Sequence, residues 1–178
     1  YHAKNVVVDP VMVATSGARL IDDAAVAVLE ERLIPLADVI TPNIPEAEVL
    51  SGLRIKTAAD LLAAAEDIAT RFGCAVLCKG GHGLSDTDAD DLLWSCGSAH
   101  WLKARRIDNP NTHGTGCTLS SAIASNLAKG FDLMQATRRA KSYVTDALLA
   151  MLDLGQGSGP MNHAFALTGG YAEGPVGG

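Results

Sequence analysis

The chain has 178 residues and a formal net charge of −6, and 48% of its residues are hydrophobic while 4% are aromatic. This length and apolar content exclude a disordered chain and predict an ordinary domain with a sizeable core, in which helices pack on a sheet. The acidic balance, without a basic run or a long apolar segment, argues against nucleic acids and membranes as partners.

The first quarter of the chain alternates short apolar runs with helical patterns. Residues 5–9 form an apolar run that ends in Asp9, as a buried parallel strand would. Residues 22–35 begin with acidic residues and carry apolar residues at helical spacing, which predicts a helix that ends at a proline. A second strand is predicted over 37–41. Residues 45–52 predict a short helix that starts with proline and ends with glycine.

The clearest helical pattern covers residues 57–73. Thr57 is suited to cap its amino end, Asp60 completes a capping box, and Gly73 follows its last turn. An apolar strand comes next and leads through Lys79 into a glycine loop.

The second half predicts a hairpin and two long helices. The hairpin covers 91–107 and turns near Gly97 and Ser98, and the helices cover 114–130 and 132–152. Strands that alternate with helices predict an α/β fold with a mainly parallel sheet, whose ligands bind at the carboxyl ends of the strands.

Four cysteines, Cys74, Cys78, Cys96 and Cys117, show neither a CxxC pair nor zinc-ligand spacing. We therefore expect free thiols in a cytoplasmic protein.

The segment NTHGTGCTLS, residues 111–120, places two glycines and a cysteine where a helix begins. The first amides of a helix have no partner within it, its dipole is positive there, and glycine lets the backbone close on an anion. The turn Gly114, Thr115, Gly116 and Cys117 thus predicts a cradle for a phosphate or an oxyanion. The alternative is an ordinary glycine loop, since no Walker A motif is present.

Cys117 itself allows several interpretations. A helix start favours the thiolate form of a cysteine, whereas a small buried apolar residue is the commoner role of this residue type. A cysteine hydrolase would require His113 or His163 within hydrogen-bond reach of Cys117.

Three further polar residues follow strand ends or begin a helix. Glu46, three residues after Asn43, could hold magnesium directly or through water, or could simply favour the helix start. Lys79 could reach a phosphate or lie on the surface, and Asp9 could bind a cofactor or belong to a turn.

The order of five segments carries a more specific signal. DPVM, TPNIPEA, LCKGGH, NTHGTGCTLSSAIA and GSGPMNH together resemble the phosphomethylpyrimidine kinases of thiamine biosynthesis, within the ribokinase-like superfamily. The resemblance covers about residues 4–166. It implies a three-layer αβα sandwich, with residues 1–168 as the C-terminal two-thirds of a kinase domain and 169–178 as a glycine-rich flexible tail.

The resemblance also implies the chemistry: ATP- and Mg²⁺-dependent phosphorylation of 4-amino-5-hydroxymethyl-2-methylpyrimidine and of its monophosphate. Cys117 is expected to act as the base toward the acceptor hydroxyl, at a position where most of the superfamily has aspartate. Most of the superfamily also has aspartate where Asn111 stands. The amides of 114–117 are expected to hold the transferred phosphoryl group.

The remaining implied roles concern three groups of residues. The nucleotide is expected to contact Lys79, Asn43, Thr112 and Asp9, and magnesium to be held by Glu46 and Asp9. The floor of the pyrimidine pocket is expected to be Val11 and Met12.

Members of this family begin with a further N-terminal region, so we expect this chain to lack about a third of the fold and to be poorly active by itself. The intact protein is expected to be a cytoplasmic homodimer whose partners are small molecules. Two alternatives stay open: a pyridoxal kinase of the same cysteine-bearing type, and a non-catalytic remnant that binds nucleotide.

Overall fold

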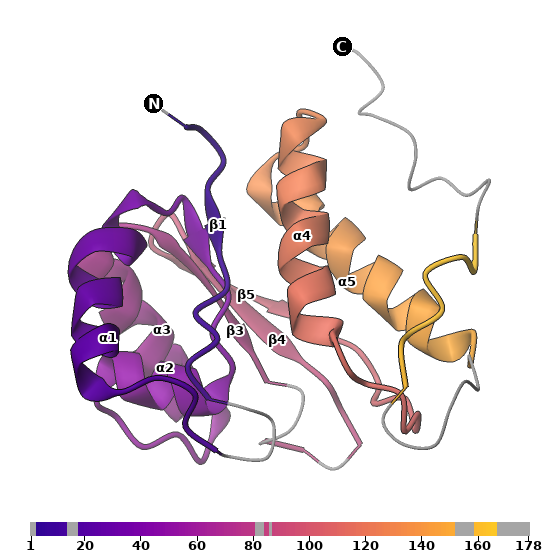
Figure 1. Cartoon of the computed structure of the whole chain (residues 1–178), viewed down its shortest axis with the longest axis horizontal. Helices are drawn as coiled ribbons and strands as arrows, with labels where there is room; N and C mark the ends of the chain where they lie inside the picture. The colour runs from indigo at the N-terminus through magenta and orange to yellow at the C-terminus, as the bar shows by residue number, and fades with distance from the viewer. Residues whose placement is uncertain (1–2, 14–17, 81–83, 86, 152–158, 167–178) are drawn as a thin grey trace. The chain divides into compact units, whose positions relative to one another are not determined.

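The computed structural model describes residues 3–13, 18–80, 84–85, 87–151 and 159–166, and it consists of two compact units that meet in sequence between Arg106 and Ile107. The first unit holds a sheet and three α-helices, and the second holds two α-helices with the loops beside them (Figure 1). The predicted tail, 169–178, lies outside the described residues, and the predicted single domain over 1–168 stays a prediction.

The sheet of the first unit has five strands in simple sequential order: β1 (Val7–Val8), β2 (Val39–Ile40), β3 (Ala75–Lys79), β4 (Asp91–Ser95) and β5 (Ser98–Leu102). The pairs β1–β2 and β2–β3 are parallel, whereas β3–β4 and β4–β5 are antiparallel. All strands except β4 therefore run in the same direction. The predicted α/β architecture with a mainly parallel sheet is confirmed.

The predicted helix over 22–35 is only partly confirmed. It comprises α1 (Asp23–Val28), a π-helical turn η1 (Leu29–Leu33) and a 3₁₀ turn η2 (Ile34–Leu36). A π-turn contains more residues than an α-turn, so it shifts the buried position along the chain. Leu33, which an uninterrupted helix would bury, is 43% exposed, and Ile34 is fully buried in its place.

Helices α2 (Ile44–Ser51) and α3 (Ala58–Phe72) match their predictions within about a residue, and each ends at a glycine in the left-handed region. The buried face of α3 packs on β3 and β4, and α2 packs on α3. In Figure 1, α1, α2 and α3 lie together on one face of the sheet. Their apolar side chains form the core of the unit with Val8, Met12, Ile40, Val76 and Leu92.

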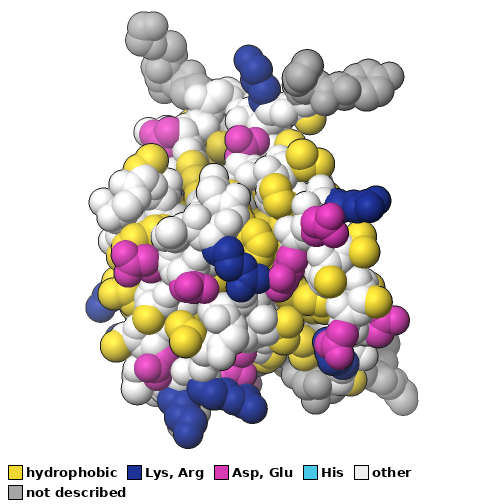
Figure 2. Space-filling model, turned by 90° about the vertical axis from the view of Figure 1, so that its left-hand side faces the viewer, with side chains coloured by type: hydrophobic (Ala, Val, Ile, Leu, Met, Phe, Trp, Pro, Cys, Tyr) yellow, Lys and Arg dark blue, Asp and Glu magenta, His cyan; other side chains and the backbone are white. Residues whose placement is uncertain are grey.

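The hairpin of β4 and β5 turns one residue earlier than predicted. Cys96 and Gly97 both have positive φ, 51° and 71°, as the two central residues of the turn that matches the twist of antiparallel strands. Figure 2 shows the face of the first unit that carries α1, where acidic, basic and hydrophobic side chains are interspersed. In the described parts of the chain, no helix combines the length and apolar character that a bilayer span requires.

The second unit is built on α4 (Thr115–Ala128) and α5 (Leu133–Leu149), which pack against each other. Both helices were predicted, α4 to within two residues of each end. Asp132 caps α5 by accepting the Gln135 N–H, and Arg139 Nε donates to Asn126 Oδ1 across the pair at 2.8 Å. The Arg139–Asn126 contact holds α5 beside α4, and Asn109 Nδ2, in the loop that leads into α4, donates to the Leu148 carbonyl of α5 at 2.7 Å.

Candidate functional site

A polar cluster lies at the carboxyl ends of the parallel strands in the first unit. Asp9 follows β1, and its Oδ1 accepts from Lys79 Nζ at 2.9 Å and from Thr41 Oγ1 at 3.1 Å. The ion pair is largely sheltered, with side-chain exposures of 17% for Lys79 and 12% for Asp9. Lys79 is therefore not the freely solvated surface lysine that the sequence allowed.

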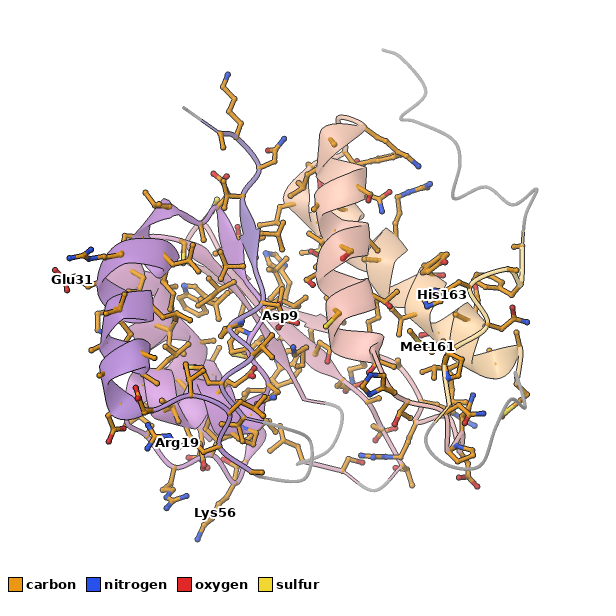
Figure 3. All side chains as sticks on the ribbon, in the orientation of Figure 1. Asp9, Arg19, Glu31, Lys56, Met161 and His163 are labelled. Atoms are coloured by element: carbon orange, nitrogen blue, oxygen red, sulfur yellow. The ribbon has the colours of Figure 1, made fainter. Side chains whose placement is uncertain are left out.

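The sheet itself brings these residues together. Parallel strands end at the same edge, so the residues after β1, β2 and β3 are neighbours. The Lys79 N–H donates to the Pro42 carbonyl at 2.8 Å, which aligns the end of β3 with the segment after β2. Figure 3 marks Asp9 at the end of β1. The predicted position of Asp9 and Lys79 at strand ends is confirmed.

Glu46 occupies the buried first turn of α2 and is only 2% exposed. Its Oε2 accepts from the Asn43 N–H at 2.8 Å, and the Asn43 side chain accepts from the Glu46 N–H at 2.9 Å, which completes a capping box. Its Oε1 accepts from the Met12 N–H at 3.0 Å. Glu46 thus caps its helix, as the sequence allowed, and each of its carboxylate oxygens accepts a backbone hydrogen bond.

Val11 and Met12, the predicted floor of a pyrimidine pocket, differ sharply in their surroundings. Met12 is 1% exposed and belongs to the core, while Val11 is 46% exposed and has φ of +45°. Positive φ is unfavourable for a β-branched residue and indicates a turn held by its surroundings. Of the two side chains, Val11 is the accessible one; contact with a ligand stays a prediction for both.

The predicted cradle lies in the second unit, at the start of α4. Gly114 is the residue before the helix and has φ of +83°, a conformation in which glycine avoids the cost that a side chain would bring. Among the five α-helices described, α4 alone begins without a side-chain cap. The first amides of α4 have no earlier carbonyl within the helix, so they suit an anionic group.

Hydrogen bonds within the second unit shape the loop before α4. The Thr112 carbonyl accepts from the Thr115 hydroxyl at 3.1 Å, and Asn111 Oδ1 accepts from the Gly159 N–H at 2.7 Å. His113 forms an isolated parallel bridge with Pro160. Gly159 and Pro160 therefore support the turn, although the sequence suggested no contact between them.

The thiols fall into two classes, and all four are free. Burial raises the pKa of the Cys78 thiol to about 12 and the pKa of the Cys74 thiol to about 11, so both stay protonated at neutral pH. Cys96 and Cys117 are exposed. Cys117 is thus an accessible thiol in the first turn of a helix, and not a buried packing residue.

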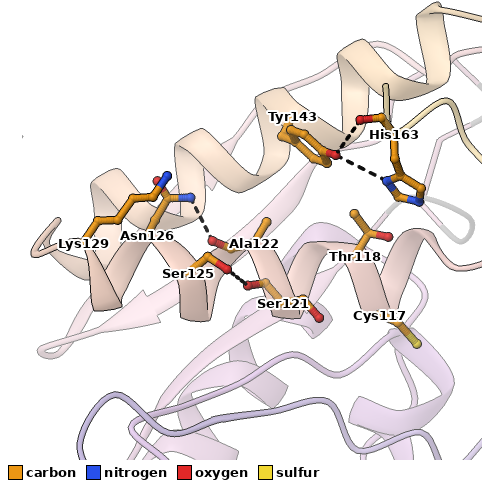
Figure 4. Close-up of a pocket in the computed structure, with 9 residues that line it drawn as sticks. All are labelled: Cys117, Thr118, Ser121, Ala122, Ser125, Asn126, Lys129, Tyr143 and His163. Carbon is orange, nitrogen blue, oxygen red and sulfur yellow. Dashed lines mark hydrogen bonds between the residues drawn. The ribbon is translucent and has the colours of Figure 1, made fainter. Parts of the chain in front are cut away.

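A pocket of about 450 Å³ lies beside this turn, between α4 and α5 (Figure 4). It is lined by Cys117, Thr118, Ser121, Ala122, Ser125, Asn126, Lys129, Tyr143 and His163. Tyr143 Oη lies 3.4 Å from His163 Nδ1, and their rings are stacked. No hydrogen bond joins the Cys117 side chain to His113 or His163, both of which are described, so the arrangement does not favour a cysteine hydrolase.

Most residues of this pocket, and Thr41, were not predicted from the sequence. The pocket residues recur three or four positions apart along α4 and have small or polar side chains, a spacing that marks one face of a helix. That pattern was visible in the sequence. The role of Thr41 was not, because it depends on the pairing of strands distant in sequence.

The predicted magnesium ligands, Asp9 and Glu46, are a pair, and their joint role stays a prediction. Within the described ranges, no three His, Cys, Asp or Glu side chains are grouped to hold a metal ion. Asp9 Oδ2 takes part in none of the described hydrogen bonds, whereas both oxygens of Glu46 do. Asp9, Asn43, Glu46 and Lys79 belong to the first unit and the 112–117 turn to the second, so their predicted convergence on one nucleotide stays a prediction.

Comparison with known proteins gives a consistent result. The model of the phosphomethylpyrimidine kinase family matches residues 1–162. The chain is 48% identical over 161 residues to a hydroxymethylpyrimidine/phosphomethylpyrimidine kinase of Synechococcus elongatus, covering 90% of this chain and 61% of that protein. It is 49% identical over 166 residues to the thiamine biosynthesis bifunctional protein ThiED of Geobacter sulfurreducens, covering 93% of this chain and 34% of that protein.

Solved structures agree in fold. The ADP complex of Bacillus subtilis pyridoxal kinase matches with a TM-score of 0.80 and 39% identity, over 90% of this chain and 59% of that one. Phosphomethylpyrimidine kinase from Clostridium difficile matches with a TM-score of 0.70 and 41% identity, over 83% of this chain and 58% of that one. The chain thus spans about 60% of the length of several of its relatives.

Proposed function

The chain belongs to the phosphomethylpyrimidine kinase family, and from that premise we propose that its protein transfers the γ-phosphoryl group of ATP to 4-amino-5-hydroxymethyl-2-methylpyrimidine and to the monophosphate of that compound, in thiamine biosynthesis. The α/β fold is that of the ribokinase-like kinases. The observation that carries the proposal is the exposed Cys117 in the first turn of α4, a helix whose amino end has no side-chain cap.

The α4 turn suits phosphoryl transfer because catalysis of this reaction depends mainly on positioning and on the stabilisation of charge. Backbone amides and the positive end of the helix dipole stabilise the equatorial phosphoryl oxygens. As the thiolate, Cys117 Sγ accepts the proton of the acceptor hydroxyl and becomes a thiol, while that oxygen bonds to the transferred phosphorus and the bond to the departing ADP oxygen breaks. The proton is released late in such a reaction, so a weak base is sufficient.

The polar cluster of the first unit fits a nucleotide with its metal. Lys79 supplies a sheltered cation for phosphate, and Asp9 has a carboxylate oxygen outside the described hydrogen bonds. Mg²⁺ is usually held by one or two carboxylates together with substrate phosphates and water, so a cage made of protein ligands is not required. We therefore propose that Asp9, rather than Glu46, is the carboxylate that would bind Mg²⁺.

A pyridoxal kinase is the second candidate, since several solved structures that resemble this chain are pyridoxal kinases. One from Staphylococcus aureus has a TM-score of 0.84 at 31% identity. The curated relatives with 48% and 49% identity carry thiamine-pathway names instead, which is why the pyrimidine comes first.

The test is a kinase assay on the full gene product that contains these residues. The pyrimidine alcohol, its monophosphate and pyridoxal are compared as acceptors with ATP and Mg²⁺. We expect both pyrimidines to be phosphorylated with higher kcat/KM than pyridoxal. Faster turnover of pyridoxal would move the assignment to the second candidate, and nucleotide binding without turnover of any acceptor would identify a non-catalytic remnant.

Light scattering of the same preparation tests the proposed homodimer, and cell fractionation tests the cytoplasmic location.

Variants of Cys117 test its role as the base. Cys117→Ala should lower kcat by roughly 10²–10⁴-fold, the range of general base catalysis, with little change in nucleotide affinity because the backbone turn persists. Cys117→Asp should recover part of the rate with the neutral alcohol and less with the monophosphate, since a fixed carboxylate repels an anionic acceptor. A near-normal kcat for Cys117→Ala would show that the thiol only packs and is not the base. Equal recovery of Cys117→Asp with both acceptors would contradict the repulsion between carboxylate and monophosphate, but not the role of Cys117 as the base.

A further inference from the structure

Glu46 links two segments that are 34 residues apart in sequence. One carboxylate oxygen closes the capping box of α2 and the other accepts the buried Met12 N–H. The carbonyl of the same residue, Met12, accepts from the Leu20 N–H at 2.9 Å. Both backbone polar groups of Met12 are therefore fixed, and its side chain lies in the core.

The residue before this anchor carries the strain. Val11 has φ of +45° and an exposed side chain, and its other neighbour on the chain, Pro10, is buried. Upstream, Asp9 is held by Thr41 and Lys79. A β-branched residue keeps positive φ only where the residues around it over-determine the backbone, and here the anchors stand on both sides.

We infer that Glu46 is a positioning residue for the acceptor: by holding the Met12 N–H, it keeps the Val11 turn in the strained form that presents the Val11 side chain to the pyrimidine. This inference rests on the proposed function. It gives Glu46 a role that differs from the metal binding that its place in the sequence suggests. Each oxygen of this 2% exposed carboxylate accepts a backbone N–H and keeps a second lone pair. The two hydrogen bonds thus explain the position of the carboxylate without a metal, and the kinetics below distinguish the two roles.

The decisive variant is Glu46→Gln. Glutamine can replace glutamate in a capping box, so the α2 cap is kept. An amide has one acceptor oxygen where a carboxylate has two, so the Met12 N–H loses its partner. The matched control is Asp60→Asn in α3, where the native carboxylate closes the same kind of capping box but accepts only from Lys56 and Thr57 nearby.

Steady-state kinetics of the full gene product distinguishes the two roles of Glu46. In Glu46→Gln we expect the KM for the pyrimidine to rise roughly tenfold, the equivalent of one lost hydrogen bond. The Mg²⁺ concentration for half-maximal rate and the KM for ATP should stay within about twofold of the parent, and Asp60→Asn should change none of the three. A raised Mg²⁺ requirement with an unchanged pyrimidine KM would overturn the inference in favour of a metal role, and unchanged values throughout would overturn it as well.

A double-mutant cycle with Val11→Gly tests the strain itself. Glycine adopts positive φ without cost, so the turn no longer needs the Glu46 anchor. Glu46→Gln should then raise the pyrimidine KM less in the Val11→Gly background than in the parent, whereas additive effects would contradict the coupling.

The Met12 amide gives a readout that does not depend on catalysis. Its hydrogen exchange should be faster in Glu46→Gln than in the parent and unchanged in Asp60→Asn. If the parent phosphorylates no acceptor, the proposed function fails, yet this exchange still decides whether Glu46 holds the turn. Equal protection in the parent and Glu46→Gln would refute the inference.

Discussion

Helices α2 and α3 follow one another in sequence and begin with the same device, yet the two capping boxes are placed very differently. The box of α2, Asn43 and Glu46, is largely buried and its acid also binds Met12 of a distant segment. The box of α3, Thr57 and Asp60, is exposed and its acid binds only the two residues before the helix. The same local pattern thus only caps the helix in α3, whereas in α2 it caps the helix and also anchors a distant segment.

This difference shows that burial and a second partner, rather than the motif, decide what a capping residue does. A carboxylate with two oxygens closes a box with one and keeps the other for another donor. In α3 a single oxygen, Asp60 Oδ2, accepts from Thr57 and also from Lys56, next in sequence to the cap. In α2 the second oxygen of Glu46 reaches the strained turn beside a proposed acceptor site.

The largest expected difference between the two capping boxes is in their contribution to the free energy of unfolding. Glu46→Ala leaves the Met12 and Asn43 N–H groups without their acceptor. Because an unsatisfied buried donor costs about 1–3 kcal/mol, we expect the free energy of unfolding, measured in urea, to fall by roughly 2–4 kcal/mol. Asp60→Ala should lose clearly less, because water replaces the carboxylate at an exposed helix start. Equal losses would show that the two boxes are energetically alike.

A second link between the same two segments should give a smaller effect. Thr41→Val keeps the shape of the side chain but removes the hydroxyl that donates a hydrogen bond to Asp9. We therefore expect the free energy of unfolding, measured in urea, to fall by about 1 kcal/mol. Thr41→Ser retains the hydroxyl and should stay closer to the parent. If serine and valine were equally destabilising, the packing of the methyl group, and not the hydrogen bond, would be the contribution of Thr41.

The carboxyl ends of the two helices should show no such contrast. Gly52 and Gly73 have nearly equal φ, +71° and +70°, and a Cβ atom would meet nothing within 4 Å at either position. Each alanine substitution should therefore cost roughly 1 kcal/mol, from backbone conformation alone. A marked difference in thermal unfolding between the two variants would mean that α2 and α3 differ in more than their first turns.

The smallest expected effect is the pH dependence of the exposed box. The Lys56 N–H, followed by the hydroxyl and N–H of Thr57, lowers the pKa of Asp60 below its ordinary value of 3.8. A lowered native pKa means that the ionised cap stabilises the fold above pH 3.8 and that this contribution is lost as the pH falls through the native pKa. The stability advantage of the parent over Asp60→Asn should shrink over that range, and a constant difference would rule out the ionised cap.

The sequence predicted local features well and distant contacts poorly. Thr57, Asp60 and Gly73 bound α3 as predicted, because caps depend on residues a few positions apart. The spacing of Asn43 and Glu46 likewise indicated a helix start, but it could not reveal Met12, which β-sheet pairing brings near. Positive φ at Val11 could not be predicted either, since valine is among the residue types least suited to it.

The candidate site follows the same division. Asp9 and Lys79 were predicted at strand ends, and the glycine turn before Cys117 at a helix start, from neighbours in sequence. The contact of Asn111 with Gly159 spans 48 residues and was not predicted. The π-turn in the first predicted helix was not predicted either, because apolar spacing alone does not distinguish it from an α-helix that continues.

The sequential order of the strands bears on how the sheet assembles. β4 and β5 are joined by two residues and β3 is the next strand upstream, whereas β2 and β1 join only through crossovers that contain helices. Contacts between nearby residues form with less loss of chain entropy than distant ones. We therefore expect the β3–β5 meander to form early in folding and β1 to dock late, so that closure of the Glu46–Met12 link is a final and slow event of folding rather than part of its nucleus.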